Sequence, residues 1–146
     1  MMKKASVIFL IMVFLAALSV AAAAQSGRYV RIFRDNGYDM YLDTKTIIRG
    51  GGVTSFWIKS VYSDEGKAAV RKGLPAKAKK SAIEYGMDYF QYDSKKNRYN
   101  VKMSSVYAGE KEVFREGSRK WRPLKEGSLA KAVWLKADEY LKNMKK

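Results

Sequence analysis

Alternating apolar and polar residues run through most of the chain after residue 25 and predict β-strands. Residues 28–34 (RYVRIFR) and 38–43 (YDMYLD) flank Asn36-Gly37, a dipeptide that favours a tight hairpin because both residues accept positive φ. Further strand-like segments follow at residues 53–62, 85–93, 98–107 and within 108–117, and WRPL at 121–124 ends the β-rich region. The pattern therefore predicts an antiparallel sheet.

Three consecutive glycines, Gly50 to Gly52, separate TIIR from VTSFWIK and raise the question of a phosphate-binding loop. A loop of the P-loop kind needs a lysine after its glycines and a helix whose N-terminus faces the phosphate. Here no lysine follows directly, and the next residues are β-branched and aromatic. The glycines are therefore predicted to form a hairpin connection.

Two of the predicted strands differ in how their apolar residues divide between faces. The strand at 53–62 has apolar residues on both faces, which predicts a central strand covered on both sides. The strand at 98–107 is expected to be apolar on one face only. The first strand places Val53, Trp57 and Val61 opposite Phe56, Ile58 and Tyr62, and the second places Tyr99, Val101, Met103 and Tyr107 opposite Arg98, Asn100, Lys102 and Ser104.

After Gly127 the apolar period lengthens to that of a helix. Ser128 is a good N-cap, and the apolar residues of 129–144 fall within an arc of about 140°. This arc contains Leu129, Ala130, Val133, Trp134, Ala137, Tyr140, Leu141 and Met144, with Leu135 as the apolar exception. We expect this helix to pack on the apolar face of the sheet. A membrane-surface helix is the alternative, but Asp138 and Glu139 weaken it.

The N-terminus has the pattern of a secretory signal. MMKK precedes an uncharged apolar run from Ala5 to Ala24, and Ala22 and Ala24 fit a small-residue cleavage site before Gln25. The sequence thus predicts a signal peptide at 1–24 and a single domain at 25–146. An uncleaved anchor is the alternative. Because the chain has no cysteine, a lipid-bearing cysteine after the signal is excluded. In either case the domain is expected to be exported to the periplasm, cell surface or medium.

The remaining domain is strongly basic. Without Lys3 and Lys4, 27 cations face 14 anions, a net charge of +13. Such a charge favours an anionic partner: an acidic polysaccharide, an anionic lipid surface or an extracellular protein. Because the domain is expected to be exported, nucleic acid is not predicted as a partner. The alternative is that the charge serves only solubility. The sequence does not indicate an oligomeric state.

Positive charge is concentrated in residues 63–84. Gly66, Gly73 and Pro75 interrupt helical pattern there, so a turn or two of helix within an exposed mobile connection is expected. This segment is the candidate anion-binding patch, with a solvated connection of no binding role as the alternative. Its cations are Lys67, Arg71, Lys72, Lys77, Lys79 and Lys80.

The chain lacks histidine and cysteine, which removes the commonest general base, thiolate nucleophiles and most transition-metal sites. Asp39 and Asp43 share one side of a predicted strand and could hold a cation weakly, but the segment lacks the glycine and closing glutamate of a calcium loop. They are predicted to form a solvated strand face. No catalytic residue, cofactor or metal site is predicted.

Several short motifs resemble the bacterial surface-adhesin protein E family over most of the chain after the signal. They are MYLDTKTI, FWIK, YDSKKNRYNV, VYAG, WRPL and EGS before the terminal helix. The positions that match are Tyr41, Leu42, Asp43, Ile47, Trp57, Lys59, Asp93, Arg98, Tyr107, Gly109, Trp121, Gly127 and Ser128. The resemblance implies an α+β fold with an antiparallel sheet of about six strands and the C-terminal helix packed on one face. It also implies display on the cell surface or in the envelope, with adhesive binding to matrix proteins.

One departure from the family concerns the link between helix and sheet. Similar family members have a cysteine at the position of Ser94 and a second in the terminal helix, whereas this chain has neither. Without this disulfide, the helix relies on burial alone, and the lost constraint could amount to about 2–4 kcal/mol.

The sequence as a whole favours an exported, non-catalytic, adhesin-like binding module that recognises an anionic or matrix partner through a basic surface. One alternative is a structural or accessory periplasmic protein with no dedicated ligand. Another is an enzyme or an enzyme inhibitor. Inhibition of lysozyme-like enzymes is disfavoured, because those enzymes are usually basic and would repel a domain of charge +13.

Overall fold

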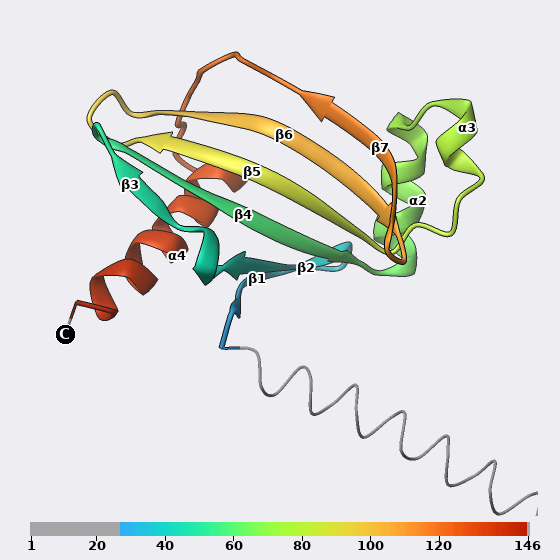
Figure 1. Ribbon diagram of the computed structural model, residues 1–146, viewed down its shortest axis with the longest axis horizontal. Coiled ribbons are helices and arrows are strands. Elements are labelled where there is room, and N and C mark those ends of the chain that lie inside the picture. The colour runs from blue at the N-terminus through green and yellow to red at the C-terminus, as the bar shows by residue number, and fades with distance from the viewer. Residues whose placement is uncertain (1–26, 146) are drawn as a thin grey trace, which may run out of the picture.

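A computed structural model describes residues 27–145 of the chain, and the predicted signal at 1–24 lies outside them. One antiparallel sheet has the strand order β1–β2–β4–β5–β6–β7, with the short strands β3 beside β4 and β8 beside β6 (Figure 1). The strands are β1 (Tyr29–Arg34), β2 (Tyr38–Asp43), β3 (Ile48–Gly50), β4 (Val53–Tyr62), β5 (Tyr85–Asp93), β6 (Arg98–Ala108), β7 (Lys111–Gly117) and β8 (Arg122–Pro123). The predicted α+β class is confirmed: a sheet of six main strands with a C-terminal helix.

Both predicted hairpins form, and each has a local chemical reason. The β1–β2 turn is held by the Asp35 carboxylate, whose Oδ1 accepts from the backbone N–H of Gly37 at 2.6 Å. Between β3 and β4, Gly51 and Gly52 have φ of +61° and +79°, values that glycine adopts without steric cost. The glycine run is therefore a two-residue hairpin turn, as predicted, and no helix follows it.

The C-terminal helix α4 (Leu129–Asn143) packs on one face of the sheet, as predicted. The Ser128 side chain caps it, with Oγ accepting from the backbone N–H of Lys131 at 3.2 Å. Its buried residues meet apolar side chains from β1, β2, β4 and β5. The core so formed contains Ile32, Met40, Leu42, Phe56, Ile58, Phe90, Tyr92, Leu124, Ala130, Val133 and Ala137.

Residues 63–84 differ from the mobile connection predicted for them. They form helix α2 (Asp64–Gly73) and the short helix α3 (Ala76–Lys79), which pack on the same face of the sheet as α4, at its other end (Figure 1). Leu74, Ala78 and Ile83 are buried there against Val106 of β6. The segment is thus part of the folded domain, because its few apolar residues fall on the side that meets the sheet.

Gly66 explains why the prediction of a mobile segment was wrong. Ser63 caps α2, and Gly66 lies in the first turn, against the backbone of Gly37 in the β1–β2 turn. A Cβ at Gly66 would overlap the carbonyl oxygen of Gly37. This glycine is therefore required by a close approach between two segments and does not break the helix.

Two further sequence predictions about strand faces need correction. No described element packs on the side of β4 that bears Trp57, so β4 is central in the sheet but covered on one face only. In β6 a bulge changes the register: Phe90 faces Val101, whereas Tyr89 faces Met103. The extra residue moves Met103 to the face opposite Val101, so β6 is apolar on both faces.

Candidate functional site

The face of the sheet opposite the helices is lined by aromatic side chains. Alternation along the strands and their register bring them together from β1, β2, β4, β5 and β6. We call this surface the open face and define it by Tyr29, Tyr41, Trp57, Lys59, Tyr85, Met87, Tyr89, Met103 and Tyr107, all of which are half-buried. These side chains shield one another, while no described element covers them. A contiguous aromatic surface that no described element covers is a candidate interaction site.

Lys59 lies at the centre of the open face. Its Nζ is 4.4 Å from the ring centroid of Tyr85 and 5.5 Å from that of Tyr29. The ring of Tyr85 in turn stacks on Tyr107, with centroids 4.9 Å apart and planes within 4°. The ammonium group is thus held by ring quadrupoles, since no carboxylate of residues 27–145 pairs with it.

Four carboxylates on the same side of the sheet are paired with arginines. The ion pairs are Arg28–Asp43 at 2.7 Å, Arg34–Asp39 at 3.2 Å, Arg98–Asp93 at 3.2 Å and Arg115–Glu112 at 2.7 Å. The hydrogen bond from Arg115 is the main cause that lowers the pKa of Glu112, so this carboxylate stays ionised and paired. Glu84 and Glu110 lie near Tyr85 at one end of the face, and their charges add to the burial that raises the pKa of its hydroxyl.

The same ion pairs correct the sequence interpretation of Asp39 and Asp43. Asp43 is buried and accepts two hydrogen bonds from the Arg28 guanidinium, at 2.9 and 2.7 Å. It therefore does not belong to a solvated strand face. Among residues 27–145, no group of three or more His, Cys, Asp or Glu side chains could hold a metal ion.

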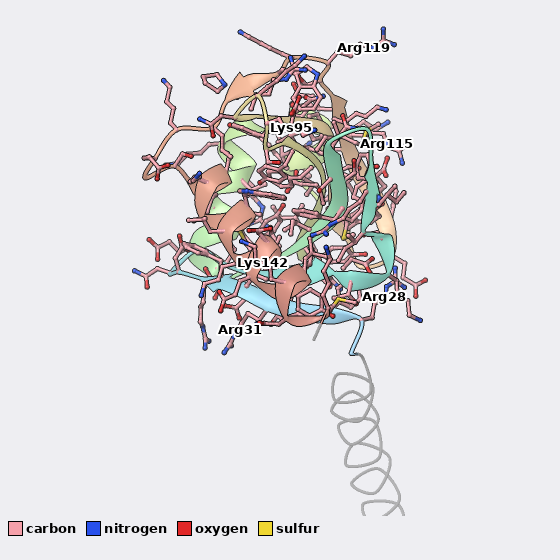
Figure 2. The ribbon with its side chains drawn as sticks, turned by 90° about the vertical axis from the view of Figure 1, so that its left-hand side faces the viewer. Arg28, Arg31, Lys95, Arg115, Arg119 and Lys142 are labelled. Carbon is pink, nitrogen blue, oxygen red and sulfur yellow. The ribbon has the colours of Figure 1, made fainter. Side chains whose placement is uncertain are left out.

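The predicted cationic patch lies away from the open face, on α2 and α3 at the helix-bearing end. Lys67 pairs with Asp64 at 3.8 Å, and the guanidinium of Arg71 donates to the carbonyl oxygen of Ser81 at 3.5 Å. Both are half-buried, whereas Lys72, Lys77, Lys79 and Lys80 are exposed. Positive charge is also spread elsewhere: Figure 2 shows Arg28 and Arg115 on one side of the molecule and Arg31 and Lys142 on the side of α4.

A cleft of about 570 Å³ separates α2 from α4 on the helix-bearing face. Its floor includes Asp88 of β5 and Ser104 of β6, and Ser104 Oγ donates to Asp88 Oδ1 at 2.5 Å. Burial is the main cause that raises the pKa of Asp88, and the hydrogen bond from Ser104 partly opposes it. The cleft is lined by both polar and apolar side chains. The apolar part is formed by Met40, Val70, Phe90, Val101 and Leu129, and the polar part includes Ser60, Tyr62, Ser118, Glu116 and Arg122.

Comparison with known protein families identifies the family of the chain. The family model for surface-adhesin protein E matches residues 29–137. This chain belongs to the surface-adhesin protein E family. Membership indicates an adhesin-like binding protein that is exported or on the cell surface. No curated protein and no solved structure matches the chain. No helix within residues 27–145 is long and apolar enough to cross a membrane.

Several positions that match surface-adhesin protein E motifs stabilise the sheet. Asp93 and Arg98 form an ion pair across the β5–β6 hairpin, and the Arg98 guanidinium lies 4.5 Å from the centroid of Trp121. Trp57 and Lys59, which also match, lie on the open face. The family resemblance thus pointed to part of this surface, although not to its extent.

Sequence reasoning missed both the open face and Asp88 as site residues. The signal for the open face was present in β5, where Tyr85, Met87 and Tyr89 alternate with residues of the other side. Alternation alone does not tell which face a helix covers. Asp88 had no signal, because an aspartate within a strand usually points to solvent.

Proposed function

We propose that the protein is an exported, non-catalytic adhesin-like module that binds an acidic polysaccharide through the open face. The observation that carries the proposal is Lys59, held between the rings of Tyr29 and Tyr85 with no carboxylate partner among the described residues. An acidic sugar offers both groups that this arrangement lacks: an anion for the ammonium and flat C–H surfaces for the rings.

The aromatic residues favour an extended sugar polymer as the ligand over a small inorganic anion. The Trp57 ring packs against Tyr89 with centroids 5.2 Å apart and planes tilted by 35°, and Tyr85 stacks on Tyr107. These ring pairs lie on neighbouring strands of a hydrogen-bonded sheet, which fixes their spacing before a ligand arrives. A preformed surface loses little entropy on binding. Because the rings are half-buried by one another, they offer a broad shallow surface that fits an extended chain.

Charge also favours an anionic ligand. The arginine partners of Asp39, Asp43, Asp93 and Glu112 neutralise these carboxylates locally, which leaves the ammonium group of Lys59 as the cation at the centre of the face. The domain after residue 24 has a charge of +13, which attracts polyanions from a distance. The exposed lysines of α2 and α3 contribute to this attraction without forming the contact surface.

Calorimetric titration with a heparin octasaccharide tests the proposal, with neutral dextran as the matched ligand control. We expect binding to the octasaccharide that weakens as salt rises, because exposed charges are screened within about 8 Å at physiological ionic strength. Trp57→Leu, which removes a ring of the open face but keeps an apolar side chain there, should weaken binding at least tenfold. Leu135→Ala, at an exposed position of α4, should bind like the wild type.

Three results would oppose this function. If dextran binds as tightly as the octasaccharide, charge has no part in recognition. If Trp57→Leu binds the octasaccharide as tightly as the wild type does, the open face is not the binding surface. Tight binding to anionic phospholipid vesicles with none to the octasaccharide would indicate a lipid surface as the partner.

A further inference from the structure

The charge environment of Asp88 differs from that of the two well-buried carboxylates of the domain. Asp43 and Asp93 each have an arginine at 2.7 and 3.2 Å, respectively. Asp88 has the Ser104 hydroxyl as its hydrogen-bond donor, and no lysine or arginine of residues 27–145 is within ion-pair distance of it. In a chain with 29 cations, a desolvated carboxylate without a counter-ion is conspicuous.

The position of Asp88 gives a ligand access to its carboxylate. It lies on the floor of the cleft between α2 and α4, where part of its surface remains exposed. The Tyr62 hydroxyl also lines the cleft; burial, and then the charge of Asp88, raise the pKa of Tyr62, so this group stays protonated. Gly86 leaves room for it, because a Cβ there would overlap the Tyr62 oxygen.

The shape and lining of the cleft define the rest of the ligand. Its volume of about 570 Å³ falls within the range of small-molecule sites, which is roughly 300–1,000 Å³. Phe90, Val101 and Met40 provide an apolar surface beside the carboxylate, and Val70 of α2 and Leu129 of α4 provide apolar contacts from the two helices. A ligand that fits has a hydrogen-bonding cation at one end and an apolar body.

We propose that the cleft between α2 and α4 is a binding site for a small organic ammonium ion, with the Asp88 carboxylate as its counter-ion and the apolar walls holding its body. Ser104 is a positioning residue, because its hydroxyl orients Asp88 Oδ1 and leaves the second oxygen free for the ligand. Glu116 and Arg122 also line the cleft, and their opposite charges offset each other. The selectivity of the cleft for a cation therefore depends on Asp88. This site is independent of the open face.

The test uses 2-phenylethylammonium chloride as the probe and its neutral analogue 2-phenylethanol as the control. Two-dimensional NMR titration of the full protein should give saturable shifts of the backbone amides of Ser104, Phe90 and Leu129 with the ammonium compound. We expect the alcohol to bind at least tenfold more weakly. Asp88→Asn, which keeps an oxygen acceptor for Ser104, should weaken ammonium binding at least tenfold, whereas Glu116→Gln should change it less than threefold.

The thermal melt of Asp88→Asn verifies that the variant is folded. The proposal is overturned if the alcohol binds as well as the ammonium ion or if Asp88→Asn binds as the wild type does. It is also overturned if no shift saturates at millimolar probe, or if the shifted amides lie outside the cleft.

Discussion

The hydroxyl group of Tyr92 on β5 donates a hydrogen bond to the carbonyl oxygen of Ala130 in the first turn of α4, at 3.0 Å. The Tyr92 ring also stacks on Trp134 with centroids 5.0 Å apart. Tyr92 is fully buried, so one side chain provides both the polar and the apolar link between sheet and helix. In a chain without cysteine, such contacts hold α4 in place.

Removal of this hydroxyl should weaken the link measurably. Tyr92→Phe keeps the ring but leaves the Ala130 carbonyl oxygen without this donor in a dry environment. We expect a loss of about 1–2 kcal/mol in the free energy of unfolding, measured by chemical denaturation. Tyr99→Phe, at a half-buried position with no hydrogen bond from its hydroxyl among the described residues, is the control and should change little. Equal effects of the two substitutions would contradict the assigned role of Tyr92.

Burial of the helix face should be worth more than this hydrogen bond. Val133 of α4 is completely buried, whereas Leu135 on the same helix is 54% exposed. Val133→Ala should lower the free energy of unfolding by about 2 kcal/mol through lost burial and a residual cavity. Leu135→Ala should alter it by less than about 0.5 kcal/mol. Denaturation curves that shift equally would mean that α4 does not pack as described.

The contact between α2 and the β1–β2 turn makes Gly66 sensitive to substitution. A Cβ at this position would overlap a backbone carbonyl, which a side-chain rotation cannot relieve. Gly66→Ala should therefore destabilise the protein by about 2–4 kcal/mol. Gly73→Ala, near the end of the same helix with open space around it, should be neutral or stabilising by up to about 1 kcal/mol. Thermal melts of both variants distinguish a docked α2 from a mobile segment, for which Gly66→Ala would be harmless.

The pH dependence of stability tests the environment of Asp88. Burial raises its pKa in the folded state, so folded protein holds the proton more tightly than unfolded protein does. The stability from this group is fully present below the unfolded pKa, near about 3.9, and is lost as pH rises through the folded pKa. Asp88→Asn cannot ionise, so it should be more stable than the wild type at pH 7 and lose that advantage near pH 4. The opposite result would be a free energy of unfolding for Asp88→Asn, relative to the wild type, that is lower at pH 7 than at pH 4. It would mean that the folded protein stabilises the ionised form of Asp88, contrary to this account.

The sequence predicted the parts of the fold that depend on local pattern. Alternation located the main strands, Asn36-Gly37 and the glycine run located two hairpins, and Ser128 marked the start of α4. Prediction failed where the structure of a segment depends on contacts with residues far away in the sequence. The close approach of Gly37 requires a glycine at position 66 inside a helix, and the bulge in β6 moves Met103 to the open face through pairing with Tyr89.

The candidate site was the least predictable part, for a similar reason. The cations at 67–80 stand out in the sequence because they are close together along the chain. The residues of the open face come from five strands and meet only through their register. Asp88 faces the cleft because both helices lie on its side of the sheet and neither covers it, an arrangement that the local pattern does not encode.

The proposed binding face and the predicted cationic patch can be separated by one matched comparison. Lys59→Gln removes one charge from the open face, and Lys77→Gln removes one from α3, so the net charge changes equally. Surface charges contribute little to stability, so both variants are expected to fold. The measurement is the salt concentration at which each protein elutes from immobilised heparin. If the open face is the binding surface, the first variant elutes at clearly lower salt than the second, which stays close to the wild type. If instead the α3 variant elutes first, or the two variants elute together, the binding surface is not the open face.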